Sequence, residues 1–264
     1  MKDANFLKDN GVNLEKSLEL LGDMETYNET LIDFLNAVFD KMTKIKLYKE
    51  SKNMPDYAIL VHSLKSDARY LGFDLLADIA YKHEIESKAN NQLFVNENFN
   101  ELVNEAAKIV TLVRQYLGQT PTPKQEEVKE ESSKELNITN DALLVVDDSS
   151  IMQNFLDKIF SDRYQIIIAS DGKEALDVLN AGHNDKIKCM LLDLNMPNIN
   201  GFEVLEYLKA NNLFDVIPVS IITGADSRET ITKAFSYPIV DMLTKPFTEL
   251  SVKTIVEKTV AQKK

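Results

Sequence analysis

The sequence predicts two domains, an all-α four-helix bundle followed by an α/β doubly wound domain around a five-stranded parallel sheet. Residues 1–118 contain long stretches of apolar residues at helical spacing. Residues 141–264 instead alternate short apolar runs with amphipathic helices, which is typical of a parallel sheet covered on both faces. Between them, residues 119–140 contain two prolines and an acidic, polar segment that is typical of a solvated linker.

Composition and charge narrow the classes of function. The chain has 264 residues, is 44% hydrophobic and has a formal net charge of −12, with no local basic patch to attract nucleic acid. No apolar run approaches the length of a membrane span, and the single cysteine, Cys189, excludes an internal disulfide framework. We therefore expect a cytoplasmic protein that neither binds nucleic acid nor inserts into a membrane. The initial methionine and a final helix lead us to expect a complete chain.

The helices expected in the first domain follow from apolar periodicity and from residues that suit helix ends. Asn53 is a suitable N-cap, Pro55 and Asp56 suit a first turn, and Gly72 is typical of the position just after a helix. These residues bound one expected helix, and the other helices are expected at residues 13–21, 25–49, 73–88 and 99–117. Short loops between successive helices favour antiparallel packing in a four-helix bundle.

One histidine stands out on the helix expected after Asn53. His62 lies off the apolar stripe, so we expect it to point toward solvent, and Lys65, Ser66 and Arg69 follow on the same face. A neutral imidazole nitrogen is a nucleophile near pH 7, and the two cationic side chains could compensate the charge of a phosphoryl group. The alternative is a plain exposed histidine beside ordinary surface lysines.

Five apolar runs predict the strands of the second domain, and polar residues gather at their ends. The runs are residues 142–146, 166–169, 187–192, 217–222 and 239–243, with helices expected around 150–160, 172–180, 201–210, 227–236 and 248–262. The residues that follow or end these runs are Asp147, Asp148, Asp193, Thr223 and Lys245. Ligands of doubly wound sheets bind at the carboxyl ends of the strands, where these side chains would meet.

The chemistry of these side chains is that of phosphoryl transfer. Three carboxylates together require a cation, and hard oxygen ligands favour Mg²⁺. One carboxylate could then attack phosphorus, Thr223 could donate a hydrogen bond to a phosphoryl oxygen, and Lys245 could neutralise another. Taken singly, each residue also has a structural explanation; Asp148, for example, could cap the helix that begins near Ser150.

Two stretches of sequence resemble known families. The string HSLKSDARYLG at residues 62–72 resembles the signature of histidine-containing phosphotransfer (HPt) domains, with Ser66 where that family most often has glycine. This resemblance covers about residues 5–117 and implies that His62 accepts the phosphoryl group, with Lys65 as its electrostatic partner.

Residues 141–262 resemble the response-regulator receiver domain, which has a flavodoxin-like fold. The matching strings are LLVVDDS at 143–149, LLDLNMP at 191–197 followed by Gly201, ITGA at 222–225 and TKPF at 244–247. The resemblance implies that Asp193 is the phosphoacceptor and that it binds Mg²⁺ with Asp147, Asp148 and the backbone carbonyl of Asn195. Met242 is a departure, because receivers usually have Tyr or Phe there and move that ring together with the Thr.

Together the resemblances imply a two-component phosphorelay protein that carries phosphohistidine on His62 and aspartyl phosphate on Asp193. Its partners would be a sensor histidine kinase or other receiver or HPt proteins. No glycine-rich ATP-binding motif is present, so we expect a phosphoryl carrier rather than a kinase. Transfer between its own domains is feasible, because a flexible linker of about 20 residues spans roughly 25 Å. The alternatives are a phosphorylation-controlled binding switch that does not use His62 and, ranked lower, an aspartyl phosphatase.

Overall fold

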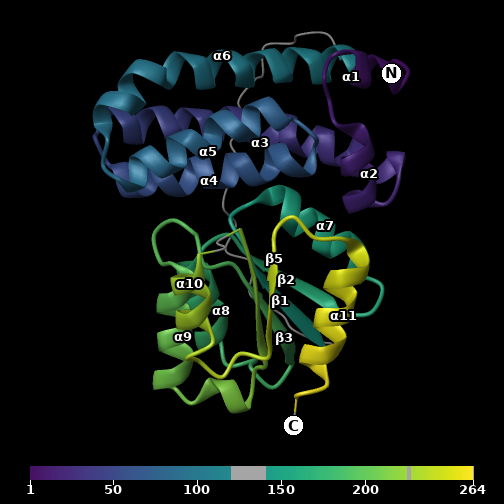
Figure 1. The fold of residues 1–264 in the computed structure, drawn as a ribbon. Coiled ribbons are helices and arrows are strands. Elements are labelled where there is room, and N and C mark those ends of the chain that lie inside the picture. The colour runs from purple at the N-terminus through teal and green to yellow at the C-terminus, as the bar shows by residue number, and fades with distance from the viewer. Residues whose placement is uncertain (120–140, 225–226, 264) are drawn as a thin grey trace.

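The computed structural model describes residues 1–119, 141–224 and 227–263. These form a helical region (residues 1–119) and an α/β unit (residues 141–263), and Figure 1 shows the helical region lying across one end of the α/β unit. The linker expected at residues 119–140 lies outside the described residues except for Gln119. The domain boundaries therefore stay a prediction.

The N-terminal region is helical, as expected. Its described residues form α1 (Asn5–Asp9), α2 (Leu14–Leu21), α3 (Met24–Glu50), α4 (Met54–Tyr70), α5 (Asp74–Lys88) and α6 (Gln92–Leu117). Helix α4 packs against α3 and α5, and α6 packs against α5 and α3. The sequence analysis missed α1. It also placed the start of α6 too late, because the Asn91 side chain caps that helix by accepting a hydrogen bond from the Phe94 N–H at 3.2 Å.

The expected ends of α4 are confirmed. The Asn53 side chain accepts a hydrogen bond from the Asp56 N–H at 3.4 Å, and Pro55 lies in the first turn, where its missing N–H has no intrahelical partner. After the helix, Gly72 adopts a φ of 72° and lies against the backbone of Asn13 at the start of α2. A Cβ on Gly72 would lie 2.5 Å from the Asn13 carbonyl oxygen. Both the positive φ and the close approach therefore favour glycine here.

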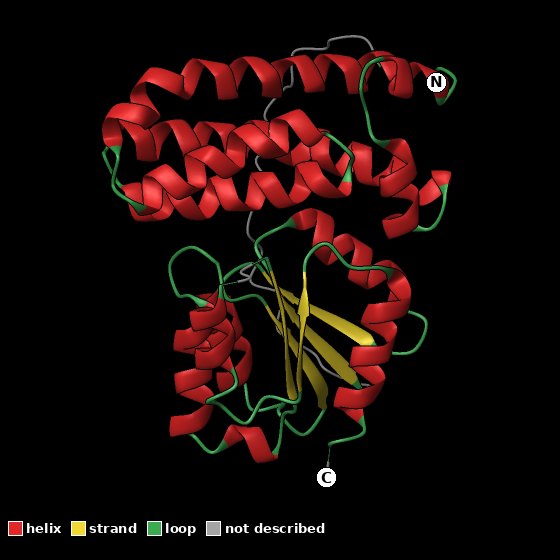
Figure 2. Ribbon diagram, viewed as in Figure 1, coloured by secondary structure: helices red, strands yellow, loops and turns green. Residues whose placement is uncertain are grey.

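The α/β unit has a five-stranded sheet in which every neighbouring pair is parallel. The strands are β1 (Ala142–Val146), β2 (Gln165–Ala169), β3 (Ile187–Leu192), β4 (Val219–Thr223) and β5 (Asp241–Thr244), in the order β2-β1-β3-β4-β5. The helices are α7 (Ser150–Phe160), α8 (Gly172–Asn180), α9 (Gly201–Ala210), α10 (Arg228–Ala234) and α11 (Glu249–Val260), with a 3₁₀ turn, η1 (Leu213–Asp215). Figure 2 shows the sheet between two helical layers: α7 and α11 on one side, and α8, α9 and α10 on the other. The predicted five-stranded parallel sheet is confirmed.

The register of the strands aligns their carboxyl ends. Val146 at the end of β1 pairs with Leu192 at the end of β3, so Asp147 and Asp193 follow side by side. Thr223 at the end of β4 pairs with Thr244, which precedes Lys245. Strands β4 and β5 each begin two residues later than the apolar runs suggested. For β4, Pro218 lacks the N–H that a ladder needs.

The helical region contacts the α/β unit at this edge of the sheet. One continuous hydrophobic core joins buried residues of α3–α6 to those of α7 and α11. Tyr70, at the end of α4, connects the two parts: its ring centre lies 6.5 Å from that of Phe155 and 5.9 Å from that of Phe247. In the described parts of the chain, no helix is both long and apolar enough to cross a bilayer.

We predict that Gly72→Ala destabilises the protein by about 2–3 kcal/mol, because the new Cβ would need both a positive φ and room that the Asn13 carbonyl occupies. Urea unfolding of the full chain measures this loss. The control is Gly11→Ala, since Gly11 has a φ of 83° but nothing within 4 Å of an added Cβ. It should cost only about 1 kcal/mol. Equal losses in the two variants would contradict the role given to the Asn13 contact.

Candidate functional site

Three carboxylates expected from the sequence meet at the carboxyl edge of the sheet. One ligand oxygen from each of Asp147, Asp148 and Asp193 lies within 4.8 Å of the others. Asp147 and Asp193 are buried, and Asp148 is half-buried. The following backbone orients two of them, because the Ser149 N–H donates to Asp147 Oδ1 and the Asn195 N–H donates to Asp193 Oδ1, both at 3.0 Å.

The expected lysine and threonine complete this cluster. Lys245 Nζ lies 2.6 Å from Asp147 Oδ2 and 2.6 Å from Asp193 Oδ2, with its side chain only 4% exposed. The Thr223 hydroxyl donates to Asp193 Oδ1 at 2.9 Å. Asp193 is therefore held through both of its oxygens, one by a hydroxyl and a backbone N–H and the other by an ammonium group.

The environment separates the pKa values of these carboxyls. Burial raises the pKa of Asp147 to about 6 and that of Asp148 to about 7, and neighbouring carboxylates add to both rises. The charge of Lys245 opposes the rise at Asp147, and that of Lys41 opposes the rise at Asp148. Burial also acts to raise the pKa of Asp193, but the charge and hydrogen bond of Lys245 overcome it and hold that pKa below its usual range. Asp193 is thus the carboxylate that stays ionised most readily, as a nucleophile must.

The donor set fits a hard divalent cation. The three carboxylates carry a formal charge of −3 when ionised, and the one ammonium that contacts two of them supplies only +1. Asp148 is available for such an ion, because it does not have the capping role considered above. Ser149 caps α7 instead, through a hydrogen bond from the Met152 N–H to its hydroxyl at 3.4 Å.

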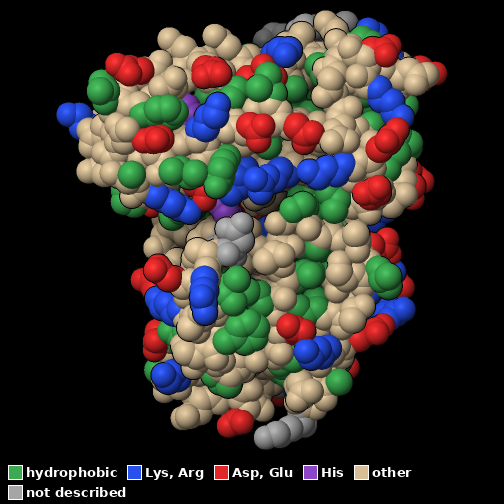
Figure 3. All heavy atoms as spheres, viewed as in Figure 1, with side chains coloured by type: hydrophobic (Ala, Val, Ile, Leu, Met, Phe, Trp, Pro, Cys, Tyr) green, Lys and Arg blue, Asp and Glu red, His purple; other side chains and the backbone are tan. Residues whose placement is uncertain are grey.

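His62 is buried, which corrects the expectation that it faces solvent. Its exposed fraction is 4%, because Gly224 of the α/β unit lies directly against the imidazole. A Cβ on Gly224 would lie 2.5 Å from His62 Nε2 and 3.4 Å from the Ser66 hydroxyl. Gly224 follows Thr223, whose hydroxyl contacts Asp193, so His62 and Asp193 belong to one site. In the space-filling view of Figure 3, a histidine side chain (purple) appears at the seam between the two parts, near Lys or Arg side chains (blue).

The sequence analysis missed Glu84, the main partner of His62. His62 Nδ1 lies 2.7 Å from Glu84 Oε1, and Lys65 Nζ lies 2.6 Å from Glu84 Oε2 and 3.2 Å from His62 Nδ1. Lys88 makes a third ion pair with Glu84, at 2.6 Å. Burial acts to raise the pKa of Glu84, but His62 and the two lysines hold it well below its usual range. Because Glu84 is on α5, no spacing within α4 points to it.

The two nitrogens of His62 therefore differ. Nδ1 contacts an ionised carboxylate, which favours the proton on that nitrogen. Nε2, which lies against Gly224, has no hydrogen-bond partner among the described residues. Arg69, expected to assist His62, has its guanidinium 5.9 Å from the centre of the Tyr81 ring. The free lone pair of the imidazole is thus on the side of the α/β unit.

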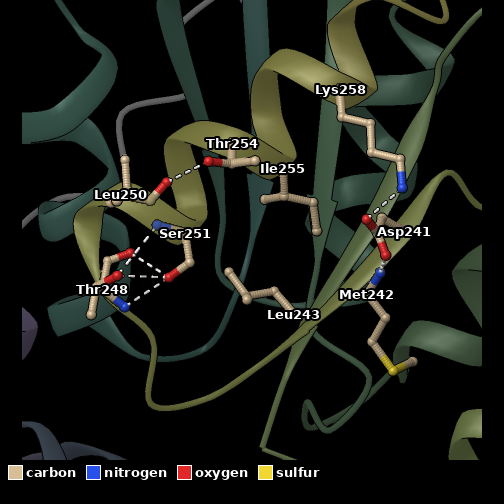
Figure 4. Close-up of a pocket in the computed structure, with 9 residues that line it drawn as sticks. All are labelled: Asp241, Met242, Leu243, Thr248, Leu250, Ser251, Thr254, Ile255 and Lys258. Carbon is tan, nitrogen blue, oxygen red and sulfur yellow. Dashed lines mark hydrogen bonds and ion pairs between the residues drawn. The ribbon is translucent and has the colours of Figure 1, made fainter.

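Met242 lies away from the carboxylate cluster. It lines a groove between β5 and α11, and Figure 4 shows the other side chains around this groove, including Leu243, Ile255 and an ion pair between Lys258 and Asp241. None of the predicted phosphoryl-handling residues lines it. Tyr237, the aromatic residue that precedes β5, packs against Phe202 of α9. The Met242 position therefore carries no aromatic ring that could move together with Thr223.

We predict that Asp148→Asn stabilises the protein at high pH in the absence of divalent ions. The pKa of Asp148 is raised from 3.8 to about 7, so the folded state binds more protons than the unfolded state between these values and loses stability as the pH rises through them. Near pH 8 in EDTA, the variant should gain about 1–2 kcal/mol, a value reduced because Asp148 is partly exposed. Near pH 4 the gain should vanish.

Urea unfolding at both pH values measures this effect, with Asp162→Asn, in the exposed turn after α7, as the control. A loss of stability for Asp148→Asn near pH 8 would contradict the repulsion inferred for the cluster.

Comparisons with known proteins identify relatives of the α/β unit. The model of the response regulator receiver domain family matches residues 143–257. Chemotaxis protein CheY1 of Helicobacter pylori is 32% identical over 117 residues, which cover 44% of this chain and 93% of that protein. A chemotaxis protein CheY homolog of Campylobacter jejuni is 31% identical over 119 residues, covering 44% of this chain and 88% of that protein. A solved receiver domain of the Francisella response regulator 1452 is 28% identical, covers 47% of this chain and 98% of its own, and has a TM-score of 0.42. Through its α/β unit, the chain belongs to the response regulator receiver family of two-component signalling.

Proposed function

We propose that the protein is a phosphorelay protein in which a phosphoryl group moves between Asp193 and His62 of the same chain. The observation that supports this most strongly is the position of His62 Nε2, which lies unpaired among the described residues and against Gly224. The neighbouring Thr223 contacts Asp193, so acceptor and donor share one site. In this proposal residues 1–118 are an HPt-like domain with α3–α6 as its four-helix bundle, residues 119–140 are the linker, and residues 141–264 are the receiver.

The transfer step exchanges one bond to phosphorus for another. The Nε2 lone pair of His62 attacks the phosphorus of an aspartyl phosphate, an N–P bond forms, and the P–O bond to Asp193 breaks. The bonding electrons return to Asp193 as a carboxylate, which Lys245 and Thr223 already contact. The phosphorylated imidazole keeps its Nδ1 proton, and the charge on the ring is balanced by Glu84. The reverse step returns the phosphoryl group to Asp193.

Mg²⁺, when bound, would neutralise charge on the phosphoryl oxygens. The residues proposed to hold it are Asp147, Asp148, Asp193 and the backbone carbonyl of Asn195. The chain's own contribution is then to position the reacting groups. Thr223 and Lys245 bind the two oxygens of Asp193, and Glu84 holds the imidazole through Nδ1. Lys65 acts on His62 from the Nδ1 side, since it contacts both that nitrogen and Glu84.

Receiver domains interact with kinases or other signalling proteins, and we propose that a sensor histidine kinase, or another receiver or HPt protein, supplies or removes the phosphoryl group. The protein is then a carrier rather than an enzyme, although its receiver would promote its own phosphorylation and dephosphorylation with Mg²⁺. The alternative, a binding switch that does not use His62, gives no reason for the pairing of Nδ1 with Glu84 or for the approach of Nε2 to Gly224.

We predict that acetyl phosphate and Mg²⁺ label both carriers in the full-length chain. The unaltered protein should acquire an alkali-labile acyl phosphate and an acid-labile, alkali-stable phosphohistidine. Asp193→Ala should lose both labels, because the histidine is loaded through the aspartate, and His62→Ala should keep the acyl phosphate alone. The yield of phosphohistidine should not depend on protein concentration, since transfer is within one chain. Absence of acid-labile, alkali-stable phosphate from the unaltered protein would rule out the relay.

We also predict that Gly224→Ala reduces transfer to His62 while leaving the formation of aspartyl phosphate intact. The added Cβ would lie 2.5 Å from Nε2, and the ring is restrained on its other side by Glu84. A displacement of this size at a reacting nitrogen should lower the rate of phosphohistidine formation by roughly tenfold. Rapid-quench labelling with acetyl phosphate measures both species. Gly182→Ala, in an open loop far from His62 in sequence, is the control, and equal rates in the two variants would refute the close approach.

A further inference from the structure

We propose that the receiver surface formed by α7 and the segment after β5 is the docking surface for this chain's own helical region. This contact hides His62 and Asp193 from all other phosphoryl donors and acceptors until the two parts separate. This inference rests on the proposed function, because only a phosphoryl carrier would need to be hidden. Its test does not, since the experiment requires no phosphoryl transfer. Docking would thereby decide whether a phosphoryl group moves within the chain or is exchanged with a partner.

An aromatic contact forms the centre of this docking surface. Tyr70 of α4 is buried between Phe155 of α7 and Phe247 after β5, and all three rings are at most 4% exposed. The Phe247 N–H donates to the Tyr70 hydroxyl at 2.9 Å. Because these rings belong to one hydrophobic core that includes both parts, the contact resembles the interior of a domain rather than a loose contact between two surfaces.

A buried polar contact lies beside the rings. The Ser149 hydroxyl donates to Asp67 Oδ1 at 2.7 Å, and Lys41 of α3 pairs with the other oxygen of Asp67. The backbone N–H of the same serine holds Asp147 of the carboxylate cluster. Since Asp67 and Ser149 are both buried, separating the two parts would return a carboxylate and a hydroxyl to water together. Docking is thus specific for this pair of surfaces.

An exposed ion pair lies at the edge of the docking surface and can be altered without touching the site. Lys158 of α7 contacts Glu29 of α3 at 2.6 Å and the Thr26 hydroxyl at 3.0 Å. The side chains of Lys158 and Glu29 are 45% and 55% exposed, so reversing the charge of one of them should weaken docking without disturbing either core.

Both proposed carriers are withdrawn from the surface in the docked arrangement. His62 is 4% exposed and Asp193 is 2% exposed. A protein partner could not bring phosphorus to Nε2 while Gly224 lies against that nitrogen. Exchange with a partner therefore requires an open arrangement, and transfer between His62 and Asp193 requires the closed one.

Diethyl pyrocarbonate tests this directly, because it acylates an accessible neutral imidazole nitrogen and Nε2 of His62 is not occupied by a described partner. The chain has three histidines, which peptide mass spectrometry can follow separately. His183, half-buried in a loop of the receiver, reports ordinary reactivity, and His83, buried in the helical region, reports unfolding. In the unaltered full-length protein, His62 should react at least about tenfold more slowly than His183, since modification waits for opening.

Lys158→Glu should raise the modification rate of His62 by about threefold, because the ion pair becomes a repulsion across the docking surface. Adding Glu29→Lys should restore slow modification by forming the reversed pair. Tyr70→Ala should raise the rate further, with unchanged His83 reactivity showing that the helical region remains folded. Reaction of His62 as fast as His183 in the unaltered protein would overturn the proposal, as would a Lys158→Glu effect that Glu29→Lys does not reverse.

The two proposals can fail separately. If His62 is protected from diethyl pyrocarbonate but never becomes phosphorylated, the docking proposal stands and the relay proposal is rejected. If His62 reacts freely with diethyl pyrocarbonate but still accepts a phosphoryl group from Asp193, the relay proposal stands and the docking proposal is rejected.

Discussion

Buried negative charge at the carboxyl edge of the sheet is the constraint on which the rest of the site depends. Asp147 and Asp193 are withdrawn from water next to Asp148, and Lys245 contacts the first two at 2.6 Å. Such a cluster is costly without a cation, because burial disfavours each ionised carboxylate and the neighbouring charges add to the cost. The parallel register is what gathers these groups, since it aligns the ends of β1, β3, β4 and β5.

The helical region contacts the receiver at the same edge of the sheet, next to the carboxylate cluster. Polar contacts run from Lys41 through Asp67 and Ser149 to Asp147, while Tyr70 packs against the rings of the receiver. The helical region therefore contacts both the polar and the apolar surroundings of the carboxylate cluster. His62 reaches Gly224 as part of the same contact, so the proposed docking would also bring the two proposed carriers together.

The two proposed carriers are prepared in opposite ways. Asp193 is kept ionised by Lys245, which outweighs the effect of burial on its pKa. His62 keeps a free lone pair on Nε2 because the ionised Glu84 engages Nδ1. One site thus contains an anion balanced by an ammonium group and an imidazole oriented by a carboxylate. In both cases a residue from a different secondary-structure element does the balancing, so the tertiary fold is what prepares each carrier.

The sequence by itself determined the parallel sheet, the ends of α4 and the gathering of Asp147, Asp148, Asp193, Thr223 and Lys245. These follow from local rules: apolar runs define buried strands, and residues after parallel strands share one edge. Only the tertiary structure decided that His62 is buried, that Glu84 holds it and that Gly224 lies against Nε2. Periodicity assigns a residue to a face of its helix but does not say what covers that face. The covering groups here come from α5 and from the loop after β4, far away in the chain.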